Sequence, residues 1–109
     1  MKAPQYLRPE TRRWWRQVVA EYDLEPHHLR LLTLAAEVWD RYQAARATLD
    51  ELGLTYEYKG RPHARPEVAI ERDSRLAFAR LLRELALDVE APAESRPPTM
   101  GGRRGTDAT

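Results

Sequence analysis

The fold of this chain follows from residues 26–53, which read PHHLRLLTLAAEVWDRYQAARATLDELG. Pro26 lacks an N–H, which costs nothing in the first turn of a helix, and Gly53 can adopt the left-handed conformation that ends one. Between them a spacing of three and four residues predicts one helix about 40 Å long, at 1.5 Å per residue. The positions that follow this spacing are Leu29, Leu32, Ala36, Trp39, Tyr42, Arg46 and Leu49. Because a compact monomer of this size does not need so long a helix, we expect its far end to pack against another subunit.

A shorter helix is predicted before it, from Pro9 to about Glu21. Its apolar residues fall in two adjacent rows at helical spacing, and together they form one wide stripe that must be buried. These residues are Trp14, Val18 and Tyr22 in one row, with Trp15 and Val19 beside them.

After Gly53, Thr and Tyr alternate with polar residues on either side of Lys59-Gly60, which predicts a short β-hairpin. Pro62 makes its second strand an edge strand. Since two strands alone are barely stable, the hairpin is expected to lie on the helices or on a neighbouring subunit. A third helix is predicted from near Pro66 to near Ala86. Its apolar stripe comprises Phe78, Leu81, Leu82 and Leu85.

These elements predict a mainly α fold in one small domain of a 109-residue chain. Residues 1–8 form an N-terminal arm, residues 9–87 the helical domain with its long central helix and short hairpin, and residues 88–109 a tail. The tail is rich in Pro, Gly and charge and too poor in apolar residues to fold, so it is predicted to be disordered.

Composition limits the class of protein. Cysteine is absent, which excludes a disulfide-stapled scaffold and a thiolate metal site. No segment approaches the roughly 18 uninterrupted apolar residues of a membrane span, and no apolar run follows the N-terminal positive charge. We therefore expect a soluble protein of the cytosol, with no membrane partner.

Charge is distributed unevenly along the chain. Residues 1–20 hold five basic residues against one acidic, and residues 21–58 hold three basic against eight acidic. A basic end could meet DNA, or it could pair with the acidic middle of a neighbouring copy.

No enzyme signature is present. There is no glycine-rich phosphate loop, neither serine has the turn that a nucleophile needs, and the three histidines do not converge on one point. Glu37 and Asp40 are three residues apart on the long helix, where a solvated face is the more common arrangement than a metal or acid–base pair. We expect no catalytic residue, no metal and no cofactor.

Basic residues near the N-terminus are the better functional candidates. Several guanidinium groups lie within about two helical turns, and each can bind a phosphate in two places. The candidates for DNA contact are Arg8, Arg12, Arg13 and Arg16, with Arg103 and Arg104 in the tail as weaker ones. A merely solvated outer helix face explains the first four equally well. Trp14 and Trp15 fit a core better than a base-stacking surface.

In order and spacing, the segments at residues 9–16, 24–54, 65–73 and 78–87 resemble the small subunits of phage terminases of the P27 type, which are related to those of HK97-like phages. The resemblance covers about residues 4–88. It implies a non-catalytic protein that assembles as a ring and recognises double-stranded viral DNA at the packaging initiation site. It also implies recruitment or regulation of the large ATPase and nuclease subunit in the cytoplasm of the bacterial host. Two positions depart from the family: Ala86 stands where Gly is frequent, and Arg65 replaces a small polar residue before Pro66.

Two other functions remain open. One is a helical oligomeric adaptor that acts through protein contacts only, which suits the near-neutral net charge of +1. The other is a small DNA-binding repressor, although residues 22–25 join two helices without the glycine usual in a helix-turn-helix.

Overall fold

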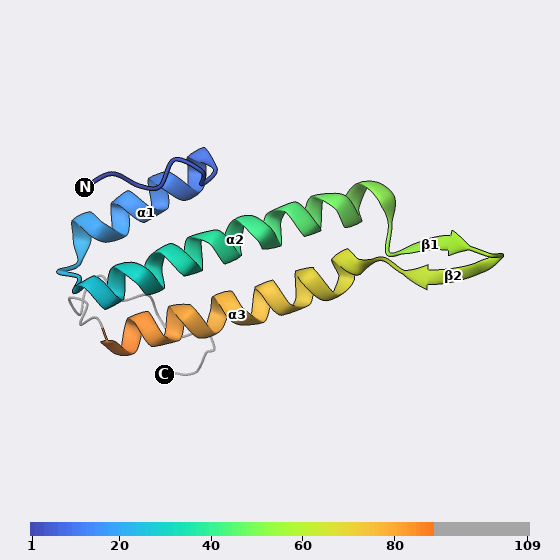
Figure 1. Cartoon of the computed structure of the whole chain (residues 1–109). Coiled ribbons are helices and arrows are strands. Elements are labelled where there is room, and N and C mark those ends of the chain that lie inside the picture. Colours follow the sequence, from blue (N-terminus) through green and yellow to red (C-terminus); the bar gives the residue numbers. More distant parts are fainter. Residues whose placement is uncertain (89–109) are drawn as a thin grey trace, which may run out of the picture.

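The structure is a computed structural model that describes residues 1–88, with side chains described through Leu85. The elements, in order, are α1 (Pro9–Glu21), α2 (Pro26–Leu52), β1 (Thr55–Tyr58), β2 (Arg61–Ala64) and α3 (Pro66–Asp88). Figure 1 shows α2 and α3 side by side and antiparallel, α1 along the first half of α2, and the hairpin projecting from the far end of the helix pair. The predicted mainly α fold with a long central helix and a short hairpin is confirmed. Most of the predicted tail, with Arg103 and Arg104, lies outside the described residues.

The helix boundaries follow from the residues that the sequence analysis singled out. Both α1 and α2 begin and end where they were predicted. Gly53 has φ 88, and its N–H donates to the carbonyl of Leu49 at 2.8 Å, which closes the last turn of α2. Only α3 differs, since it continues to Asp88 rather than ending near Ala86. Alanine and leucine favour helix, and no glycine or proline stands at residues 86–88 to stop it.

The first turn of α2 is closed by a pair of side chains that the sequence analysis did not recognise. Glu25 precedes the helix and accepts a hydrogen bond from the backbone N–H of His28, while His28 Nδ1 accepts one from the Glu25 N–H at 3.0 Å. This reciprocal arrangement satisfies N–H groups that have no partner inside a helix. His28 is buried at this position.

The core lies where α1, α2, α3 and the N-terminal arm meet. Its buried apolar residues are Ala3, Leu7, Trp15, Leu32, Ala36 and Leu85. The rest of the predicted α1 stripe packs against this cluster, half-buried. Phe78 of α3 lies between two tryptophans, with ring centroids 6.0 Å from Trp14 and 4.9 Å from Trp39. The prediction that the α1 stripe is buried is therefore confirmed.

Small residues are buried along the contact between the two long helices. Ala35, Ala36 and Ala45 of α2 and Ser74 of α3 are each no more than 7% exposed. Small side chains leave room for helix backbones to approach closely. Buried residues on α2 extend as far as Ala45, and beyond it Arg46 forms an ion pair with Glu71 of α3 at 3.9 Å.

The hairpin stands apart from the helices, so of the two surroundings expected for it only a neighbouring subunit stays a prediction. Its strands pair antiparallel in the register Thr55↔Ala64, Tyr56↔His63, Glu57↔Pro62 and Tyr58↔Arg61, around the predicted turn at Lys59-Gly60. All eight strand residues are exposed. Within the described chain the hairpin therefore does not lie on the helices, because the α2–α3 pair ends before it and leaves no apolar surface beneath it.

Candidate nucleic-acid interface

The segment that leads into α1 is fixed to the middle of α2 by two acidic side chains. The Tyr6 hydroxyl donates a hydrogen bond to Glu37 Oε2. Asp40 accepts two hydrogen bonds, from the backbone N–H of Arg8 at 2.9 Å and from Thr11 Oγ1 at 2.5 Å. Glu37 and Asp40 are thus not the solvated face expected from their spacing, because each receives a donor from the N-terminal segment.

Asp40 takes the part that the N3 side chain plays in a capping box, since it accepts from the backbone N–H of the N-cap residue, Arg8. Arg8 occupies the capping position and its own side chain makes no capping hydrogen bond. The carboxylate of Asp40 supplies the acceptor from a different helix, at the end where the helix dipole favours negative charge. The orientation of α1 on α2 is therefore held by polar contacts as well as by its apolar stripe.

The hydrogen bond from Tyr6 to Glu37 changes the pKa of Tyr6. The pKa of Tyr6 is raised above its ordinary value, chiefly because its hydroxyl donates to Glu37, with smaller contributions from burial and from the negative charge of Glu37. The Tyr6 hydroxyl therefore stays protonated, and able to donate, to a higher pH than a free tyrosine.

Three of the predicted arginines lie on the surface at α1. Arg8, Arg13 and Arg16 are exposed, and within residues 1–88 none of their side chains makes an ion pair or a hydrogen bond. Trp15 occupies the other side of the helix and is 3% exposed, which fixes which face points outward. Arg13 and Arg16 are thus exposed on α1 and Arg8 at its N-cap, with Glu10 as the single acidic residue of α1 before its last position, Glu21.

Arg12 differs from the other three. It is half-buried, and its Nη1 donates to the backbone carbonyls of Gln5 at 3.1 Å and Leu7 at 2.5 Å. The side chain turns back and closes the N-terminal arm onto α1. Its structural role was not evident from the sequence, in which it is one of four similar arginines.

A second basic region was absent from the predicted site residues. Lys59, Arg61 and Arg65 lie in and beside the hairpin, where Glu57 is the single acidic residue between Gly53 and Pro66. Three cations within seven positions around a turn were the signal that could have found them.

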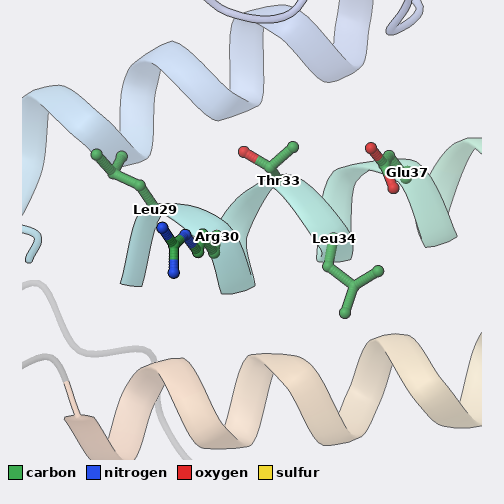
Figure 2. Close-up of a pocket in the computed structure, with 5 residues that line it drawn as sticks. All are labelled: Leu29, Arg30, Thr33, Leu34 and Glu37. Atoms are coloured by element: carbon green, nitrogen blue, oxygen red, sulfur yellow. The ribbon is translucent and has the colours of Figure 1, made fainter. Parts of the chain in front are cut away.

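Two hollows on the helical surface are not candidates for a catalytic or metal-binding site. Figure 2 shows a shallow one lined by Leu29, Arg30, Thr33, Leu34 and Glu37, with Leu34 directed toward α3 and Thr33 toward α1. A second lies between α2 and α3 beside Val38 and Ile70. Within the part of the chain that the structure describes, no group of three His, Cys, Asp or Glu residues is placed to hold a metal ion.

A family model for the small subunit of phage terminases matches residues 10–100, a span that includes nearly all of α1 and every later element. The chain belongs to this family. No curated protein and no solved structure gives a significant match. Membership supports a role in phage DNA packaging, and small terminase subunits are generally non-catalytic regulatory and DNA-recognition subunits. The narrower assignment to the P27 type stays a prediction. None of the helices in residues 1–88 combines the length and the apolar character that crossing a membrane requires.

Proposed function

We propose that this terminase small subunit binds double-stranded viral DNA at the packaging initiation site through the outer face of α1. In this proposal it acts in the cytoplasm of the bacterial host, without catalysis of its own, and recruits or regulates the large ATPase and nuclease subunit. The proposed contact residues are Arg13 and Arg16 on α1 and Arg8 at its N-cap. Arg12 adds charge while it closes the arm, and Arg103 and Arg104 are weaker candidates outside the described residues.

One observation carries the proposal: three exposed arginines without ionic partners lie within nine residues, two of them on α1 and one at its N-cap, and the helix is held by its core and by Asp40. Because α1 is already fixed on α2, its backbone needs no ordering before the arginine side chains meet phosphates. Each guanidinium can donate two parallel hydrogen bonds to one phosphate. A surface of this kind binds duplex DNA with an affinity that falls as salt rises.

The test is charge reversal in the variant Arg13→Glu/Arg16→Glu, with binding to duplex DNA measured by fluorescence anisotropy over a range of salt concentrations. We expect affinity to fall by more than tenfold, and the slope of log K against log salt to become shallower by about two, or roughly 0.9 per lost phosphate contact.

A matched control is available on α3, where Arg80 and Arg83 are exposed and have the same spacing of three residues. The variant Arg80→Glu/Arg83→Glu changes the net charge equally and should retain most of the affinity. Equal losses in both variants would mean that overall charge, rather than the α1 surface, determines binding. Circular dichroism of both variants checks that the helices remain.

We further propose that the chain assembles as a ring of identical subunits. Leu34 on α2 and Ile70, Leu76 and Leu82 on α3 are between 38% and 54% exposed. Burying these side chains against a second copy would remove apolar surface from water. Native mass spectrometry should show one discrete species well above a tetramer, and a monomer or dimer at micromolar concentration would contradict the ring.

The same exposed apolar residues favour the second candidate function, an adaptor that works through protein contacts alone. Its distinguishing result is capture of a large terminase subunit by an assembled protein that shows no salt-sensitive affinity for any DNA.

A further inference from the structure

We infer that the β1–β2 hairpin is a second DNA-binding element, separate from α1, which grips the phosphate backbone of duplex DNA. This inference rests on the proposed function, since it concerns the same ligand. It assigns a role to the one part of the described chain that has no packing role in the fold.

The register places the aromatic and basic residues on one face of the hairpin. Residues paired across an antiparallel ladder share a face, and successive pairs alternate between the two faces. One face therefore carries the pairs Tyr56–His63 and Tyr58–Arg61, and the other carries Thr55–Ala64 and Glu57–Pro62. The single acidic side chain of the hairpin lies on the face opposite to the aromatic rings.

The rings on this face contact one another. Tyr56 and His63 are stacked, with centroids 5.6 Å apart and an interplanar angle of 29°. Tyr58 meets the same histidine edge-on at 5.8 Å and 71°. Two tyrosine rings that each contact His63 stiffen a two-stranded ribbon that receives no support from the helices.

Two cations lie over these rings, one at each end of the hairpin. Lys59 Nζ is 5.4 Å from the centroid of Tyr58, and the guanidinium carbon of Arg65 is 5.9 Å from that of Tyr56. Contact with an aromatic face limits how far a long cationic side chain wanders. The positive charges are thus already positioned on the aromatic face before any ligand is bound.

The turn and the base of the hairpin fix its shape. Lys59 and Gly60 have φ values of 52 and 74, as in the two-residue turns whose twist matches that of the flanking strands. At the other end the N–H of Arg65 donates to the carbonyl of Leu54 at 2.9 Å. The hairpin therefore projects from α2 and α3 as a defined ribbon, as Figure 1 shows.

The charge and the shape of the hairpin favour DNA, rather than a second copy of the chain, as its binding partner. Within the described residues, Lys59, Arg61 and Arg65 make no ion pair, and the aromatic face carries no aliphatic side chain. A polyanion rewards every added cation through release of its counterions, so three cations without ionic partners favour DNA. A two-stranded ribbon also fits the major groove of B-DNA, which is about 12 Å wide.

The test removes hairpin charge without removing the hairpin. In the variant Lys59→Asn/Arg61→Thr, asparagine tolerates the left-handed conformation of the turn and threonine suits a strand. The probe is a duplex of mixed sequence, because phosphate contact does not depend on the bases. We expect a salt slope shallower by about two, so that the loss of affinity between about 50 and 200 mM salt becomes roughly tenfold smaller than in the unaltered protein.

A matched control and a deletion make the result decisive. Arg80→Gln/Arg83→Gln removes the same charge from α3 and should leave the slope within about half a unit. Leu54 and Arg65 are joined by a hydrogen bond, so Asn-Gly can replace residues 55–64 while the helix pair stays closed. This deletion should match the charge variant in its loss of salt dependence and should assemble as the intact chain does.

The inference is wrong if the charge variant and the deletion bind DNA with unchanged affinity and slope. It is also wrong if the deletion abolishes assembly while the charge variant binds DNA normally, because the hairpin would then be a contact between copies. Failure of the proposed function looks different: the unaltered protein would show no salt-dependent binding to any duplex. If charge reversal on α1 abolishes DNA binding while the hairpin variants bind normally, the proposal for α1 stands and only the inference about the hairpin is rejected.

Discussion

The two ends of the α2–α3 pair differ in how far their residues are buried. At the end covered by α1, three helices and the N-terminal arm converge, and the buried residues include Trp15, Leu32 and Leu85. At the other end every residue from Asp50 to Ala64 is exposed. Folding stability therefore resides at the first end, while the second end is shaped by short-range contacts within a ribbon. A substitution at the α1 end should lower the free energy of unfolding. A substitution at the hairpin end should instead weaken contact with a partner.

The largest expected effect tests this contrast directly. Leu32 is fully buried in the core, so Leu32→Ala should lower the free energy of unfolding by about 2–5 kcal/mol through lost burial and the remaining cavity. Tyr58→Ala on the exposed hairpin should lower it by no more than about 0.5 kcal/mol. Urea unfolding at fixed protein concentration measures both. Similar losses in the two variants would refute the division between the ends.

The boundary between the two ends depends on Gly53. Its φ of 88 with ψ of 179 lies in a region that is essentially reserved for glycine. Nothing lies within 4 Å of a Cβ added there, so Gly53→Ala should act through backbone strain alone, at about 1–3 kcal/mol of unfolding free energy. An unchanged urea midpoint for this variant would show that the helix end relaxes freely.

The hydrogen bonds that Asp40 accepts can be tested at the α1 end. Asp40→Ala removes the acceptor for the Arg8 N–H and for Thr11 Oγ1, and should lower the free energy of unfolding by about 1–2 kcal/mol. Asp50→Ala is the matched control, since its surface pair with Arg46 is exposed and worth about 0.5 kcal/mol or less. If the two substitutions lower the free energy of unfolding equally, Asp40 does not fix α1.

The smallest effect concerns Tyr6, whose side chain is exposed although it contacts Glu37. Tyr6→Phe should cost about 0.5 kcal/mol or less, after allowance for solvent screening. Because the pKa of Tyr6 is raised on folding, its contribution is complete below the ordinary value of 10.0 and is lost as pH rises through the higher folded value. Thermal unfolding of both proteins across that alkaline range should converge at its upper end. A difference between the two proteins that stays constant with pH would exclude the hydrogen bond as its source.

Most of the fold could be predicted from the sequence because its signals are local. Pro9, Pro26 and Pro66 begin their helices, and Gly53 ends one, through the conformation of single residues. The hairpin turn likewise depends on two adjacent residues. The outward direction of Arg13 and Arg16 followed from the apolar positions of the same helix.

What could not be predicted depends on contacts distant in the chain. Asp40 receives its donors from residues about thirty positions earlier, and no spacing rule connects them. The strand pattern likewise predicted a hairpin but not that it stands clear of the helices, so its full exposure emerged only from the structure and the grouping of Tyr56, Tyr58 and His63 on one face from the register. Arg12 could not be distinguished from its neighbours, because its carbonyl partners depend on the path of the arm.

The proline that follows Arg61 gives the exposed hairpin an unusual response to trypsin. This protease cleaves after lysine and arginine but not before proline, and within residues 1–88 the bonds after Arg8, Arg61 and Arg65 all precede one. Lys59–Gly60 therefore remains as the cleavable bond of the hairpin, in a turn that no helix protects. A cut there leaves α1 and α2 on one fragment and α3 on the other, joined by the packing of α2 on α3. The hairpin tip is thus a natural place to divide the chain into two pieces that reassemble.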